Sequence, residues 1–201
     1  MMQTPVTVPV SIDSETPWVL PNRGIVGMWC LIAAEAAIFL IFVVAYIYYL
    51  GKSLTGPLPS QILKLPIVGT ICLLSSSLTV HAAVSALRKG KVQRCTLALA
   101  ATVLLGAAFL WTTAAEWHHL IYEEGFTIRT NLFGTTYYSL VGLHASHVVV
   151  GLLFLTAAFL FSVSGRVGEV HAERLEVLSL YWHFVDAVWV VVFLVVYVLG
   201  R

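Results

Sequence analysis

The chain has 201 residues, of which 59% are hydrophobic and only 10% are charged, and its formal net charge is +1. Soluble domains carry about 25% charged residues, so this composition predicts an integral membrane protein. The near-neutral charge excludes the basic surface that a nucleic-acid-binding protein needs, and three cysteines without a close pair predict neither a disulfide framework nor a thiolate metal site.

The chain begins with a predicted polar arm, residues 1–23, which has prolines at positions 5, 9, 17 and 21. Five apolar segments follow, each of about 20 residues or more, which is enough for a helix to cross a hydrocarbon core of about 30 Å. Their length and uniform apolarity exclude the short alternating strands of a membrane barrel. We therefore predict an all-α fold, an integral membrane bundle over residues 24–201 with five transmembrane helices at about 24–50, 66–87, 96–117, 133–163 and 177–199.

The Lys and Arg residues predict how these helices are oriented, because cytoplasmic loops carry an excess of both. Seven fall on the side of the N-terminus and four on the opposite side. The short connection at residues 88–94 alone carries four of the seven. We expect a cytoplasmic N-terminus and an outside C-terminus, with residues 164–176 forming a short amphipathic helix or an extension of the fifth span.

Two carboxyl side chains, Glu35 in the first span and Asp186 in the last, are predicted to lie near the middle of the bilayer. An ionised carboxylate there costs roughly 2.5 to 3.5 kcal/mol, so each must face protein, water or a lipid headgroup, or be protonated. Glu35 is either a group that handles protons or binds a headgroup, or a protonated side chain with only a structural role. Asp186 shares a helix face with His183, and His81 of the second span lies at a comparable depth, so the two histidines can face one cleft.

Two further histidines, His144 and His147, lie one turn apart in the fourth span. Four intramembrane histidines suggest a haem or metal site, but there is no HExxH pattern and no cysteine cluster, so packing or hydrogen bonding is the favoured interpretation. Glu116, at the end of the third span, is expected to be a hydrated group at the membrane interface beside Trp117.

Residues 181–189 (YWHFVDAVW) and residues 133–151 (FGTTYYSLVGLHASHVVVG) are the most distinctive stretches of the chain. They resemble the last two helices of the cytochrome c oxidase subunit III family, and the stretch around Glu35 resembles that family's intramembrane glutamate helix. The resemblance covers about residues 23–200, in the right order. The chain lacks the first two of the family's seven helices, as the short five-helix bacterial forms do. Shorter matches are Ala115-Glu116-Trp117, Gly125-Phe126-Thr127-Ile128, His171 and Glu176.

The resemblance implies a non-catalytic accessory subunit, without haem, copper or other metal of its own, in the bacterial plasma membrane. It implies direct contact with the catalytic subunit I, which holds haem and copper. Subunit II is expected as a further partner in the complex, and whether subunit IV and a larger respiratory supercomplex also take part stays open. It also implies bound phospholipid and support of proton uptake, with Glu35, His81, His183 and Asp186 as the groups that contact protons or lipid. Structural or interface roles are expected for His144, His147, Glu116, His171, Glu176, Trp182 and Trp189.

Four alternatives stay open at this point. Within the family, the chain can instead be subunit III of a quinol oxidase, or a homologous accessory protein of nitric oxide reduction, because the electron donor is recognised elsewhere in those complexes. From other classes, a small proton-coupled transporter or a di-haem membrane cytochrome also buries Glu, Asp and His. A transporter is expected to break its helices in mid-membrane, yet the interiors of the five spans contain no proline.

Overall fold

The computed structural model describes residues 23–53, 56, 63 and 65–200, and within them it is all-α. Five helices are long and apolar enough to cross a membrane, which confirms the predicted class and the predicted number of spans. The chain is a multi-pass membrane protein. The polar arm predicted before Arg23 lies outside the described residues. The helices are α1 (Arg23–Tyr49), α3 (Ile67–Arg88), α4 (Val92–Tyr122), α5 (Leu132–Val163) and α6 (Ala172–Phe193), with short helices η1 (Glu169–His171) and η2 (Leu194–Leu199) at the two ends of α6.

The helix ends differ from the predicted limits mainly at α4 and α6. α4 runs from residue 92 to 122, where hydropathy predicts 96–117, and α6 begins at residue 172 rather than 177. Hydropathy marks the lipid-embedded part of a helix, whereas backbone hydrogen bonding continues into polar residues until a breaker follows. After α4 that breaker is Gly125, at φ +61°, where the Phe126 N–H donates to Leu120 O at 2.8 Å.

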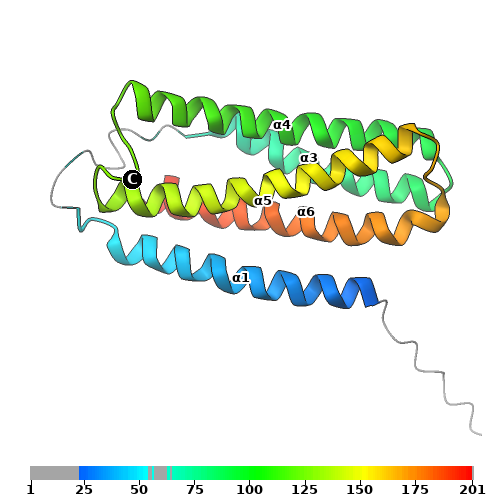
Figure 1. The fold of residues 1–201 in the computed structure, drawn as a ribbon, viewed down its shortest axis with the longest axis horizontal. Helices are drawn as coiled ribbons and strands as arrows, with labels where there is room; N and C mark the ends of the chain where they lie inside the picture. Colours follow the sequence, from blue (N-terminus) through cyan, green and yellow to red (C-terminus); the bar gives the residue numbers. More distant parts are fainter. Residues whose placement is uncertain (1–22, 54–55, 57–62, 64, 201) are drawn as a thin grey trace, which may run out of the picture.

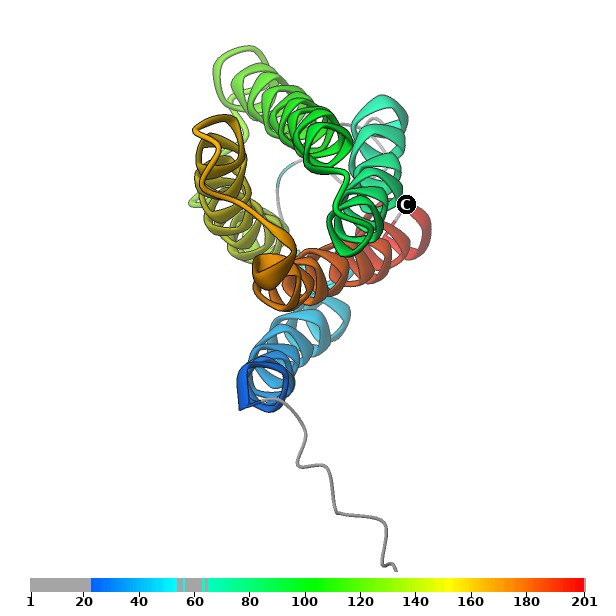
Figure 2. The same cartoon turned by 90° about the vertical axis from the view of Figure 1, so that its right-hand side faces the viewer.

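Four helices surround a shared core and the fifth lies outside it. Figure 1 shows the five long helices running side by side, and the end-on view in Figure 2 shows α3, α4, α5 and α6 in a ring with α1 beyond α6. α1 contacts α5 and α6, and buries only Phe39, Val43 and Tyr46. Most of the surface of α1 is therefore open to lipid or to another protein.

Trp182 of α6 occupies the centre of the four-helix ring. Its Nε1–H donates to Ser76 Oγ of α3 at 2.8 Å, and its ring lies where a side chain at Gly106 of α4 or Gly151 of α5 would be. A Cβ at Gly151 would come within 2.8 Å of that ring. The two glycines thus let α4 and α5 approach this large aromatic side chain of α6, the close approach that small residues permit in membrane bundles.

Hydroxyl side chains join neighbouring helices along the rest of the core. Trp189 of α6 donates from Nε1 to Thr70 Oγ1 of α3 at 3.1 Å, and Thr79 of α3 bonds to Thr102 of α4 at 2.8 Å. With no water in the hydrocarbon region, these groups find their partners in adjacent helices. The bonds fix how α3 sits between α4 and α6.

Candidate functional site: polar clusters within the membrane-spanning helices

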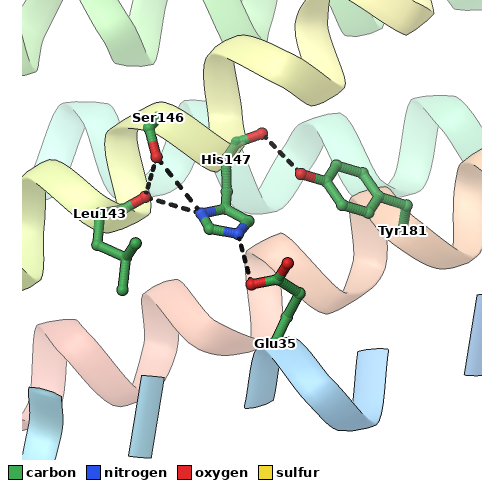
Figure 3. Close-up of polar contacts among 5 residues, drawn as sticks. All are labelled: Glu35, Leu143, Ser146, His147 and Tyr181. Atoms are coloured by element: carbon green, nitrogen blue, oxygen red, sulfur yellow. Dashed lines mark hydrogen bonds and ion pairs between the residues drawn. The ribbon is translucent and has the colours of Figure 1, made fainter. Parts of the chain in front are cut away.

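The carboxyl of Glu35 joins the outlying helix α1 to the four-helix ring. Its Oε2 lies 3.1 Å from Nε2 of His147 in α5, and the two side chains are 25% and 14% exposed. Figure 3 shows this pair, with the Tyr181 hydroxyl of α6 donating to the backbone oxygen of His147 at 3.3 Å. One histidine therefore links α1, α5 and α6.

Hydrogen bonding determines which nitrogen of His147 carries a proton. Nδ1 lies 2.8 Å from Leu143 O, and because a carbonyl oxygen only accepts, Nδ1 must carry the hydrogen. Nε2 then shares a single hydrogen with Glu35, given either by a protonated carboxyl to a neutral imidazole or by an imidazolium to a carboxylate. The pair has no net charge in either form, so α1 avoids the cost of an isolated ion in the bilayer.

A cleft of about 440 Å³ lies beside this pair, between α1, α5 and α6. Its lining is apolar apart from Glu35, Ser146, His147 and Tyr181. The cleft can therefore hold an apolar chain next to a hydrogen-bonding pair.

A second cluster joins α3 to α6 through Ser77, His183 and Asp186. The Ser77 hydroxyl donates to Asp186 Oδ2, and Ser77 Oγ lies 2.9 Å from His183 Nδ1. A hydroxyl has one hydrogen, so the imidazole must donate to the serine oxygen. The result is a directed chain from His183 through Ser77 to the carboxyl. Asp186 is buried, and its other oxygen, Oδ1, has no hydrogen-bond partner among the described residues.

His81 of α3 lies near enough to His183 for the two imidazoles to interact electrostatically. The structure thus brings together the two histidines that the sequence places at one depth. His81 itself is exposed on the surface of the bundle, about 10 Å from the end of α3 at Arg88, given a rise of 1.5 Å per residue.

Glu116 belongs to a third cluster, with two tyrosines. Tyr197 of η2 donates to Glu116 at 3.2 Å, and the Tyr137 hydroxyl of α5 lies 3.3 Å from that of Tyr197. The expectation that Glu116 ends its helix is wrong, because α4 continues to Tyr122, and the half-buried carboxyl bonds to a buried phenol. η2 is a π-helix, a wider turn that is frequent at functional sites, and it places Tyr197 in this cluster.

His144 contrasts with His147, one turn away. It is fully buried, and neither ring nitrogen has a hydrogen-bond partner among the described residues. Its ring stacks on Trp189 at a centroid distance of 4.9 Å and packs against Phe39 and Phe109. His144 is thus held by aromatic packing at the junction of α1, α4, α5 and α6.

The remaining predicted positions lie at the end of the bundle where α6 begins. Glu176 forms an ion pair with Arg88 of α3 at 2.5 Å, and His171 Nδ1 accepts from the Gly168 N–H at 3.2 Å. Of residues 164–176, predicted as a short amphipathic helix or an extension of the fifth span, only residues 172–176 belong to α6, while residues 164–168 form turn and coil. Glu176 thus joins two helices, whereas His171 orders its own loop.

The sequence assigns one role to Glu35, His81, His183 and Asp186 and does not pair Glu35 with any of them in space. The structure bonds Glu35 to His147 of α5, for which a structural or interface role is expected. The run of three serines at residues 75–77 predicts residues that pack helices together rather than a transport site, but the sequence does not show that Ser77 is the partner of Asp186. Across the residues that the structure describes, no three His, Cys, Asp or Glu side chains come together as metal ligands would.

Fold and clusters together define a multi-pass helical membrane protein whose polar side chains link its helices within the membrane. The sequence model of the family "Cytochrome c oxidase subunit III" matches residues 22–201, which is nearly the whole chain. The chain belongs to this family.

Similar relatives come from oxidases of two kinds. The chain is 34% identical to a cytochrome c oxidase subunit 3 of Alkalihalophilus pseudofirmus over 176 residues, covering 87% of this chain and 85% of the relative. It is also 34% identical to a cytochrome bo(3) ubiquinol oxidase subunit 3 of Pseudomonas aeruginosa over 181 residues, covering 89% and 86%. A quinol oxidase subunit 3 of Bacillus subtilis is 29% identical over 194 residues, covering 96% and 93%.

Proposed function

We propose that the chain is the accessory subunit III of an aa3- or caa3-type haem–copper terminal oxidase in aerobic respiration. The observation that carries the proposal is the family match over residues 22–201. Similarity to relatives named as oxidase subunits also extends over most of their length. Oxygen is reduced to water, and electrons are handled, by partner subunits. This chain stabilises the catalytic subunit, binds phospholipid and supports proton uptake.

The intramembrane clusters support a structural role for the polar side chains. Glu35 attaches α1 to α5, Ser77 and Asp186 attach α3 to α6, and Glu116 bonds to Tyr197 beyond α6. Hydrogen bonds between membrane helices are modest one by one, about 0.6 kcal/mol on average, but they fix which faces meet. A rigid bundle of this kind presents a defined surface to a catalytic partner.

A cavity at the end of the bundle where α6 begins supports phospholipid binding. It has a volume of about 480 Å³ and an apolar lining that includes Leu99, Phe154 and Leu178, and Arg166 and Arg174 lie at its border. Acyl chains suit the apolar part, and guanidinium groups bind phosphate well. We expect Arg166→Gln with Arg174→Gln to lower the anionic phospholipid retained by the purified oxidase, measured by native mass spectrometry. Arg129→Gln, near the opposite end of the bundle, is the control.

The same end of the bundle is proposed to face the cytoplasm, with the chain in the bacterial plasma membrane. It carries seven of the eleven Lys and Arg residues, which is the bias expected of a cytoplasmic side. Reporter domains fused at Met1 and Arg201 test this directly. A reporter at Met1 that is active in the periplasm would show that the orientation is the opposite of the one proposed.

The accessory role is tested by purifying the oxidase from cells with and without this chain. We expect the complex without it to keep haem and copper but to lose activity faster during turnover and to take up protons more slowly. Unchanged turnover rate and unchanged durability would contradict the proposal.

A second candidate is subunit III of a quinol oxidase, because two of the similar relatives carry that name. The complex that copurifies with a tagged form of this chain decides between the two. Oxidation of cytochrome c by that complex supports the first candidate, and oxidation of quinol without cytochrome c supports the second.

A further inference from the structure

One face of the bundle differs from the rest of the lipid-exposed surface. The first half of α3 exposes large apolar side chains as far as Leu78. The second half exposes none, and the next exposed large apolar side chain along the chain is Leu97 in α4. In α6 the stretch between Val170 and Val190 exposes none either. α3 and α6 contact each other, so these two stretches meet on one side of the molecule.

Small and polar side chains occupy this face instead. His81 and Ser85 lie four residues apart in α3 and therefore share one side of the helix, and Lys89 follows as its C-cap. Ala82 is exposed beside them, and His183 of α6 continues the polar surface through its bond to Ser77. We define the docking face as Ser77, His81, Ala82, Ser85, His183 and Ala187.

Lipid acyl chains are a poor match for the docking face. They offer no hydrogen-bond partner to an exposed imidazole about 10 Å inside the helix end, and polar groups at that depth normally face protein or a water-filled cavity. Small residues add nothing to lipid contact but allow another helix to come close. The composition of the face thus fits a packed helix.

The cytoplasmic end of the docking face, as oriented above, carries an excess of positive side chains, although the carboxyl of Glu169 lies against Gly90 between two of them. Lys89, Lys91 and Arg94 are all exposed there, and they border a groove of about 280 Å³ between α3 and α4. The other lining side chains of the groove are small: Ala82, Ser85, Ala86 and Ala98. A partner that lies along α3 would meet three cations where it leaves the membrane, so an acidic group at that point is complementary in charge.

We propose that the docking face binds a transmembrane helix of another oxidase subunit. That helix carries a hydrogen-bonding side chain at the depth of His81 and an acidic residue opposite Lys89, Lys91 and Arg94. The inference rests on the proposed function, because it names the surface through which the accessory subunit joins its complex. It goes further in assigning contact to α3 and α6, and in leaving to lipid the outer surface of α4, which exposes Leu97 and Leu104.

Photo-crosslinking in intact membranes tests the assignment. A diazirine amino acid replaces Ser85 on the docking face or, as the control, Leu104 on α4, which is 70% exposed. We expect Ser85 to yield an adduct between this chain and a second membrane subunit, and Leu104 to yield lipid adducts. Lipid adducts alone at Ser85, in a chain that still copurifies with the oxidase, would overturn the inference and leave the proposed function intact. A chain that copurifies with no oxidase would refute both.

A matched pair of substitutions gives an independent measurement. Ala82→Leu puts a bulky side chain on the docking face, and Ala107→Leu makes the same change at an exposed position of α4. We expect Ala82→Leu to lower the amount of this chain that copurifies with the oxidase about tenfold, equal to about 1.4 kcal/mol of binding free energy, and Ala107→Leu to leave it unchanged. Both variants should keep the thermal unfolding midpoint of the isolated chain. Equal copurification of the two variants would refute the assignment.

Discussion

Glu35 and His147 allow the role of a single shared proton to be measured. Because Nδ1 of His147 is committed to Leu143 O, Nε2 is left with one hydrogen to share with Glu35. If the carboxyl supplies that hydrogen, the amide of Glu35→Gln can donate it in the same place. If the imidazole supplies it, the amide oxygen must replace a carboxylate beside a positive charge. Glu35→Leu removes the bond in either case.

We take the neutral pair as the hypothesis to test, because an ion pair within a segment that crosses the bilayer must first overcome the cost of desolvating both charges. We therefore expect Glu35→Gln to lower the free energy of unfolding by less than about 0.5 kcal/mol, within the range of substitutions that break no specific feature. Glu35→Leu should cost about 0.6 to 1.7 kcal/mol, the average and the upper value measured for hydrogen bonds between membrane helices. Breaking an ion pair at this site would cost about 3 to 5 kcal/mol.

The assay is reversible unfolding in mixed micelles, with the fraction folded followed by circular dichroism. A double-mutant cycle with His147→Leu separates the pair from other effects, since only the coupling energy belongs to the bond. Should Glu35→Gln cost as much as Glu35→Leu, the neutral hydrogen bond would be the wrong description of the site.

Two further substitutions test the packing and the surface charges. Gly151→Ala places a Cβ 2.8 Å from the Trp182 ring and should lower the free energy of unfolding by about 1 to 3 kcal/mol. Gly27→Ala, which has open space around it, is the control and should cost nothing. Equal effects of the two substitutions would contradict the close packing. Arg88→Gln should lower the free energy of unfolding by at most about 1 kcal/mol, and by less at high salt, because the ion pair of Arg88 with Glu176 is partly exposed. A larger loss of stability that does not depend on salt, measured by thermal unfolding, would contradict the description of this ion pair as a surface contact.

The sequence determined the membrane class and the number of helices. Each span must satisfy its backbone internally and match the thickness of the bilayer, so length and apolarity alone reveal it. They locate both ends of α1, α3 and α5 to within one residue of the structure. The sequence also shows which side chains are costly in lipid, since Glu35 and Asp186 need partners wherever the helices lie.

Only the tertiary structure decided which partners these are. Hydropathy does not encode how a helix is rotated about its axis, and that rotation determines that Glu35 meets His147 while Asp186 meets Ser77. The end of α4 depends on local backbone geometry at Gly125, to which lipid solubility is insensitive. Side chains from distant parts of the chain share a site only after the helices pack. How closely the helices pack depends on small residues on the surfaces that face each other.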